Sequence, residues 1–168
     1  MKKLFSLILL LLIFPSASFS ENYKFQKLVT LKNPWGSSFI NNNELIVTEK
    51  SGKIKVVNIN SKKVSEIEHN LNFLEDGQGG LLDIIYKDNL IWISYTENRG
   101  NLKTSTSIAK AKLNKKELEF KNIFQAEPPI ESGYHFGSRL AIKGDYLYAS
   151  AGERGKGMIA QDSTKHPG

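Results

Sequence analysis

A histidine and a carboxylate stand in two glycine-rich segments near the end of the chain. The first segment is GYHFGSRL, residues 133–140, and the second is GERG, residues 152–155, one predicted hairpin later. A neutral imidazole has a pKa of about 6.5 and can accept a proton at physiological pH. A carboxylate bonded to its other nitrogen fixes the tautomer and stabilises the cation. The spacing therefore suggests His135 as a general base and Glu153 as its orienting partner, although a lone histidine in such a loop can equally be a packing residue.

A second segment, DGQGGLLD at residues 76–83, places three glycines around one amide side chain directly before an apolar strand. Glycines allow the backbone to approach a ligand closely, and Gln78 offers both donors and an acceptor. The same pattern also describes a turn that needs positive φ, with Gln78 merely exposed. Both interpretations of Gln78 stay open at this point.

Other kinds of chemistry find little support. The sequence has no cysteine, so a disulfide framework and a thiolate metal site are excluded. His69 and His166 make no pair with metal-ligand spacing, and the aspartates do not form the acidic loop of an EF-hand. No Gly-x-Ser-x-Gly elbow is present, and neither glycine cluster opens a helix, which argues against hydrolase, dinucleotide and P-loop functions.

The elements that must position these residues are predicted to be β-strands. Short runs rich in β-branched and aromatic residues alternate with Asn, Gly and Ser turns, and no segment has a sustained helical period. Sequence neighbours are expected to pair as hairpins. The expected strands are 27–31, 35–40, 45–49, 54–59, 81–86, 90–95, 104–113, 117–124, 139–142 and 146–150.

A weak internal repeat supports an array of similar sheets. Three segments, starting at 41, 87 and 143, each run from a polar turn through an apolar strand to a glutamate and a glycine-bearing loop. Their spacing lies near and above the roughly 40–50 residues of a propeller blade. About four strands per blade then give two to three blades, whereas a closed ring needs about four to eight. We expect residues 21–168 to be a truncated propeller, or alternatively a half-ring that assembles with a partner.

The first twenty residues have the form of a secretory signal peptide. Two lysines precede an apolar run from Leu4 to Phe14, and small polar residues follow before Glu21. The run is well short of the ~20 residues of a membrane-spanning helix, so a retained anchor is the lesser alternative. The net charge is +6, but the lysines are scattered and form no nucleic-acid-binding arm. We expect an exported bacterial protein, periplasmic or secreted, with no membrane span in its mature part.

Several segments together resemble the glucose/sorbosone dehydrogenase family, which includes the PQQ-dependent soluble aldose sugar dehydrogenases. They are NPWGSSFINNNELIVTEKSGKIKVV, GQGGLLDI, IWISYTE, HFGSRLAI and AGERG followed by AQD, in that order. The resemblance covers nearly all of residues 33–168, as the N-terminal portion of such a protein. It implies an all-β fold, a six-bladed β-propeller of which only part is present.

The resemblance also implies an activity and site residues. The family oxidises the anomeric hydroxyl of aldoses to lactones, with PQQ as hydride acceptor, calcium beside it, and an electron acceptor other than oxygen. His135 matches the base, Gln78 a polar residue that lines the site, and Arg139 a residue of the motif's scaffold that we group with Gln78 as substrate- or cofactor-binding. Glu153 stands where the family pattern GDRG has aspartate.

The resemblance places most groups that hold PQQ and calcium beyond residue 168, so we expect no metal ligand in this chain and no activity from it alone. The expected function is that of a PQQ-dependent aldose sugar dehydrogenase acting on an aldose. The alternative is a non-catalytic exported propeller that binds a carbohydrate or a protein, because this fold hosts many functions.

Overall fold

The computed structural model describes residues 23–164, and the expected signal peptide at 1–20 lies outside them. Within that range the chain is all-β apart from one 3-10 helix, η1 (Gly157–Gln161). No helix among the described residues is long and apolar enough to cross a membrane.

The first sheet contains five strands in the order β1-β2-β3-β4-β8. Four of them form an antiparallel meander, and the short β8 joins the outer edge parallel to β4. The turns between them are short and rich in Asn, Ser and Gly, which favours hairpins. The bounds are β1 (Pro34–Asn41), β2 (Glu44–Glu49), β3 (Lys53–Asn58), β4 (Val64–His69) and β8 (Glu117–Leu118).

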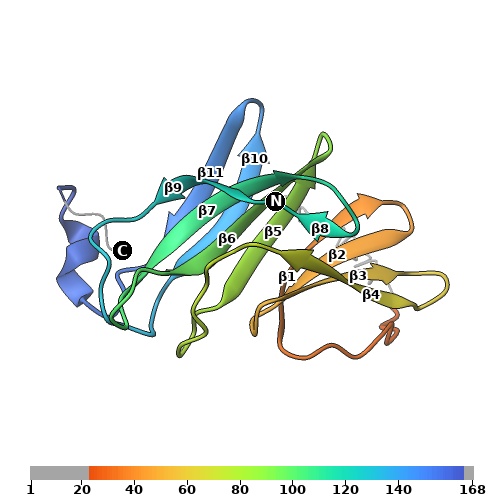
Figure 1. The fold of residues 1–168 in the computed structure, drawn as a ribbon, viewed down its shortest axis with the longest axis horizontal. Coiled ribbons are helices and arrows are strands. Elements are labelled where there is room, and N and C mark those ends of the chain that lie inside the picture. Colours follow the sequence, from red (N-terminus) through yellow and green to blue (C-terminus); the bar gives the residue numbers. More distant parts are fainter. Residues whose placement is uncertain (1–22, 165–168) are drawn as a thin grey trace, which may run out of the picture.

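The second sheet has the order β5-β6-β7-β9, again antiparallel, and a separate hairpin, β10-β11, stands beside it. Figure 1 shows the three units side by side, each strongly twisted. The first strands of the units are neighbours, because β1 contacts β5 and β5 contacts β10. The bounds are β5 (Leu81–Lys87), β6 (Leu90–Asn98), β7 (Thr104–Lys112), β9 (Lys121–Gln125), β10 (Gly137–Lys143) and β11 (Tyr146–Ala151).

Most predicted strands are confirmed, with three corrections. The stretch 27–31 forms no strand, because it finds no partner among the described residues. The stretch 117–124 splits into β8 and β9, which pair with β4 and β7 rather than with each other. β4 was not predicted, since its sequence VSEIEH buries only Ile67 and lacks an apolar run.

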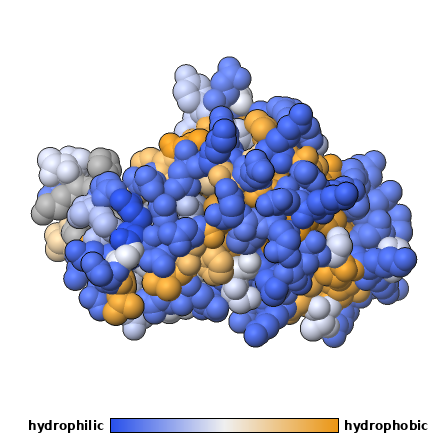
Figure 2. Space-filling view, viewed as in Figure 1, coloured by the Kyte–Doolittle hydropathy of each residue, from blue (hydrophilic) through white to orange (hydrophobic). Residues whose placement is uncertain are grey.

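The hydrophobic core lies between the first two sheets. β-branched side chains dominate it because they fit a pleated, buried surface. Burying each Ile or Leu stabilises the fold by about 1.5–3 kcal/mol before the entropy cost of ordering. The fully buried members include Ile46, Ile54, Leu81, Ile84, Ile91 and Ile93. Figure 2 shows that hydrophilic residues cover most of the outer face in this view, with hydrophobic patches between them.

The first strand of every unit carries an irregularity at the same place. The register shifts between Pro34 and Ser37 in β1, between Leu81 and Ile84 in β5, and between Gly137 and Leu140 in β10. At each irregularity a backbone N–H of the first strand donates a hydrogen bond to a side-chain hydroxyl of the second strand of the same unit. The three donor–acceptor pairs are Gly36 to Thr48, Asp83 to Ser94 and Arg139 to Ser150.

The same hydroxyls link one unit to the next. Thr48 donates to the carbonyl of Leu82 in β5. Ser94 donates to the carbonyl of Ser138 in β10 at 2.6 Å. Leu82 and Ser138 occupy equivalent positions in β5 and β10. Each directly precedes the residue, Asp83 or Arg139, whose N–H donates to a hydroxyl of the second strand of the same unit. A repeated hydrogen bond therefore fixes the spacing between consecutive units, which places the loop before β10 against the second sheet.

Candidate active site

His135 and Glu153 meet at the open end of the β10-β11 hairpin. His135 lies two residues before β10, and Glu153 lies two residues after β11, so antiparallel pairing brings them together. The Nδ1 atom of His135 contacts the Oε1 atom of Glu153. With its proton on Nδ1, the ring donates to the carboxylate and keeps a lone pair on Nε2.

The other ring nitrogen, Nε2, is not used by the protein within the described residues. No group among residues 23–164 bonds to Nε2 of His135. The side chain is 51% exposed, whereas that of Glu153 is 24% exposed. This is the arrangement that a general base needs: one nitrogen fixed by the protein and the other reachable by a substrate.

Glu153 is held in its charged form. The hydrogen bond from the His135 ring, together with the backbone N–H groups of Glu153 and Gly155, lowers the pKa of Glu153 below its usual value. An ionised carboxylate against Nδ1 favours the imidazolium that forms when Nε2 takes a proton. The pair can therefore accept one proton at Nε2 and later release it.

The glycine loop 76–80 joins the same site. Gln78 accepts the His135 backbone N–H on its side-chain Oε1 at 2.9 Å, and its own N–H donates to the Gly133 carbonyl at 2.7 Å. Gly77 and Gly80 have positive φ, as the turn interpretation requires. Gln78 is thus exposed in a glycine turn and also bonded to the histidine segment, so the two interpretations of this loop are compatible.

Arg139 lies apart from this pair. Its Nη1 atom donates to Oδ1 of Asp83 at 3.0 Å, and the other carboxylate oxygen accepts the backbone N–H of Leu140 at 2.8 Å. Asp83 is buried, while the Arg139 side chain is 75% exposed. The contact ties β5 to β10 and leaves much of the guanidinium open to solvent.

Two residues of GERG that sequence reasoning left without a role lie beneath the histidine. A Cβ on Gly152 would collide with the His135 carbonyl, so only glycine fits there. Arg154 is fully buried and bonds to the backbone of the histidine loop. In the sequence, Arg154 is marked only as a basic residue in a glycine-containing segment after a strand, and this pattern does not predict that it is buried.

The described residues offer no metal site. No group of three or more His, Cys, Asp or Glu side chains that could hold a metal occurs within residues 23–164. His69 is held by the Gly52 carbonyl at 2.8 Å and by the Leu71 N–H at 3.2 Å, which is a structural role. His166 lies outside the described residues.

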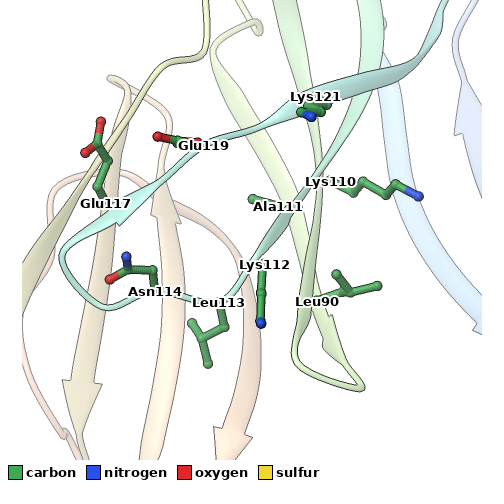
Figure 3. A pocket seen from close by; sticks show the side chains of 9 residues that line it. All are labelled: Leu90, Lys110, Ala111, Lys112, Leu113, Asn114, Glu117, Glu119 and Lys121. Atoms are coloured by element: carbon green, nitrogen blue, oxygen red, sulfur yellow. The ribbon is translucent and has the colours of Figure 1, made fainter.

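A sizeable cavity among the described residues lies elsewhere. It has a volume of about 650 Å³ and lies between the end of β7, the loop that follows and the start of β9. Figure 3 shows lysine and glutamate side chains around it, with no histidine or hydroxyl among the lining residues. This groove lacks a paired histidine and carboxylate such as His135 and Glu153, so we place the candidate site at the β10-β11 hairpin.

Comparison with known proteins identifies the family of the chain. The family model described as Glucose / Sorbosone dehydrogenase matches residues 31–168. The aldose sugar dehydrogenase YliI of Escherichia coli (strain K12) is 28% identical over 148 residues, covering 82% of this chain and 40% of that protein. This chain thus spans well under half the length of that curated relative.

Solved structures share the fold. The soluble aldose sugar dehydrogenase of Escherichia coli, in its apo form, matches with a TM-score of 0.74 and 29% identity, covering 80% of this chain and 42% of that one. The PQQ-bound aldose sugar dehydrogenase of Streptomyces coelicolor matches with a TM-score of 0.71 and 23% identity, covering 81% and 42%. At that identity the second likeness concerns the fold alone.

Proposed function

Because the chain belongs to the glucose/sorbosone dehydrogenase family, we propose that it is part of an exported PQQ-dependent dehydrogenase that oxidises the anomeric hydroxyl of aldoses. The observation that carries the proposal is the His135–Glu153 pair with an open Nε2. In this proposal the activity belongs to a six-bladed propeller, to which this chain contributes the base. The chain by itself is expected to be inactive, and the protein to work in the periplasm or outside the cell.

The proposed reaction converts a cyclic aldose to its lactone. The anomeric hydroxyl gives its proton to Nε2 of His135, the C–O bond becomes a carbonyl, and the hydrogen on the anomeric carbon departs with its electron pair. When bound, PQQ supplies the acceptor for that hydride. Glu153 stabilises the imidazolium, and solvent can then take the proton because the ring is half-exposed.

One side chain beside His135 fits a quinone. The Oε1 of Gln78 accepts the His135 backbone N–H, while no group among residues 23–164 accepts from its Nε2, so that amide would donate a hydrogen bond to an oxygen of the quinone. Arg139 is bonded to Asp83 apart from the histidine, and only the exposed part of its guanidinium would be free for a second contact. Calcium finds no ligand cluster in the described residues, so no step here depends on it.

A quinone titration tests the proposal. PQQ and calcium are added to the protein that carries this chain, and the absorbance spectrum and aldose-dependent dye reduction are followed. The proposal requires a shifted spectrum and dye reduction that saturates with sugar. A folded protein that gives neither result would instead support a non-catalytic propeller that binds carbohydrate or protein.

A further inference from the structure

The buried guanidinium of Arg154 lies directly under the loop that carries His135. Its side chain is fully buried. Its Nε donates to the Tyr134 carbonyl at 3.0 Å, and its Nη2 donates to the Ser132 carbonyl. The contact is reciprocal, because the Ser132 hydroxyl donates to the Arg154 carbonyl at 2.8 Å.

The same guanidinium is anchored to the second sheet. Nη2 donates to the Thr104 hydroxyl at 2.6 Å, and Nη1 donates to the Thr104 carbonyl at 3.3 Å. Thr104 begins β7, which places it in a rigid element. Burial lowers the pKa of Arg154 to about 10, so the group remains charged at physiological pH.

The guanidinium also packs against the residue that follows the histidine. Its Cζ lies 3.8 Å from the centre of the Phe136 ring, which is a close cation–π contact. Phe136 is buried, and its carbonyl accepts the Thr106 hydroxyl at 3.1 Å. Residues on both sides of His135 are thus held by Arg154 or by the start of β7.

This support matters because the His135 backbone is in a sparsely populated conformation. Its φ is +51°, in the left-handed region, which is uncommon for residues other than glycine although histidine adopts it more often than most. Such a conformation persists only where the surroundings fix it. Gln78 bonds to the N–H of His135, and Arg154 bonds to the preceding carbonyl.

From these contacts we infer that Arg154 is a positioning residue for His135, which sets the backbone of the base while its neighbour Glu153 sets the ring. The two adjacent residues Glu153 and Arg154 then control the tautomer and the position of the His135 imidazole, respectively. Lysine cannot replace this function, because it lacks the planar fork that reaches several acceptors at once. The consequence for turnover rests on the proposed function, but the geometric claim does not.

The test compares Arg154→Lys with Arg99→Lys as a matched control. Arg99 lies in the connection between β6 and β7 and bonds to Ser105 of β7 and to Glu127. Imidazole signals are followed by NMR and assigned with a His135→Gln variant. We expect the His135 signals to shift or broaden in Arg154→Lys only, while the His69 signals stay in place. Unchanged His135 signals, or an equal disturbance of His69, would show a merely structural arginine and overturn the inference.

Turnover gives the second readout. In the PQQ-loaded protein, Arg154→Lys should lower kcat about a hundredfold with KM changed less than threefold, since small misplacements of a base have such effects. A loss confined to KM would contradict the inference. If the wild-type protein proves inactive, the proposed function fails. The NMR comparison still tests whether Arg154 positions His135, because it does not depend on activity.

A second variant covers the case in which Arg154→Lys does not fold. Thr104→Val keeps the shape of the side chain and removes one acceptor of the guanidinium. It should shift the His135 signals in the same direction but by less. Wild-type His135 signals in a folded Thr104→Val protein would count against the inference.

Discussion

The Nδ1 atom of His135 and the Oε1 atom of Glu153 are in contact across the open end of one hairpin, although 18 residues separate them in the chain. Glutamate stands here where the family pattern has aspartate, and its longer side chain still reaches the ring. The substitution is therefore compatible with the same pairing. This contact is the basis of the first two predictions.

Removing the charge of Glu153 should slow the reaction. Glu153→Gln keeps the size of the side chain but no longer favours the imidazolium, so we expect kcat/KM to fall about tenfold or more. Glu153→Asp, which restores the family pattern, should stay within a few-fold of the wild type. Steady-state dye reduction at neutral pH measures both. Equal activity of the Gln variant and the wild type would show that the carboxylate has no role in proton transfer.

The Glu153 contact should also appear in the pH dependence of stability. The pKa of Glu153 is lowered in the folded state, so the folded protein binds fewer protons there than the unfolded chain. The stabilisation is present above the unfolded pKa and is lost as pH falls through the folded pKa. Urea unfolding of the wild type and Glu153→Gln between about pH 3 and 7 measures this. The two stabilities should converge at the acid end, and a constant difference would refute the pairing.

A side chain at position 152 should displace the backbone of His135. Alanine at this position would force its Cβ into the His135 carbonyl, so the loop must move. We expect Gly152→Ala to lower kcat about a hundredfold, because the base is displaced rather than removed. Gly144→Ala is a useful control, because no atom of the described residues lies within 4 Å of its Cβ position, although its φ of +57° makes alanine mildly strained there. Similar kcat values for the two variants would argue against a close approach at Gly152.

The hydroxyl of Ser94 links the second sheet to β10. Ser94→Ala leaves the Asp83 N–H and the Ser138 carbonyl without this partner in a buried place. We expect the free energy of unfolding to fall by about 1–3 kcal/mol. Ser37→Ala, on the exposed part of β1, should change it by less than about 0.5 kcal/mol. Chemical denaturation of both variants gives the comparison, and equal small effects would exclude the proposed link between units.

Local sequence patterns predicted much of the fold. The hairpin of β2 and β3 and that of β5 and β6 follow from apolar runs separated by short polar turns, and both are confirmed. β4 escaped prediction because an outer strand needs few buried side chains, and Ile67 alone gives no pattern. The parallel pairing of β8 with β4 could not be foreseen either, since it joins segments far apart in the sequence.

The sequence predicts only part of the candidate site. His135, Glu153 and Gln78 were proposed from residue type, glycine spacing and family resemblance, and the structure brings these three together. Arg139 was grouped with them, but its partner is Asp83. The burial of Arg154 and the close approach of Gly152 depend on the packing of β7 against the histidine loop, which no local pattern encodes.

The most direct test of the account is the activity of His135→Ala in the PQQ-loaded protein. The account predicts that aldose-dependent dye reduction falls by about 10²–10⁴, the usual contribution of a general base, while the spectrum of the bound quinone is retained. Ordinary turnover in this variant would contradict the assignment of His135 as the base.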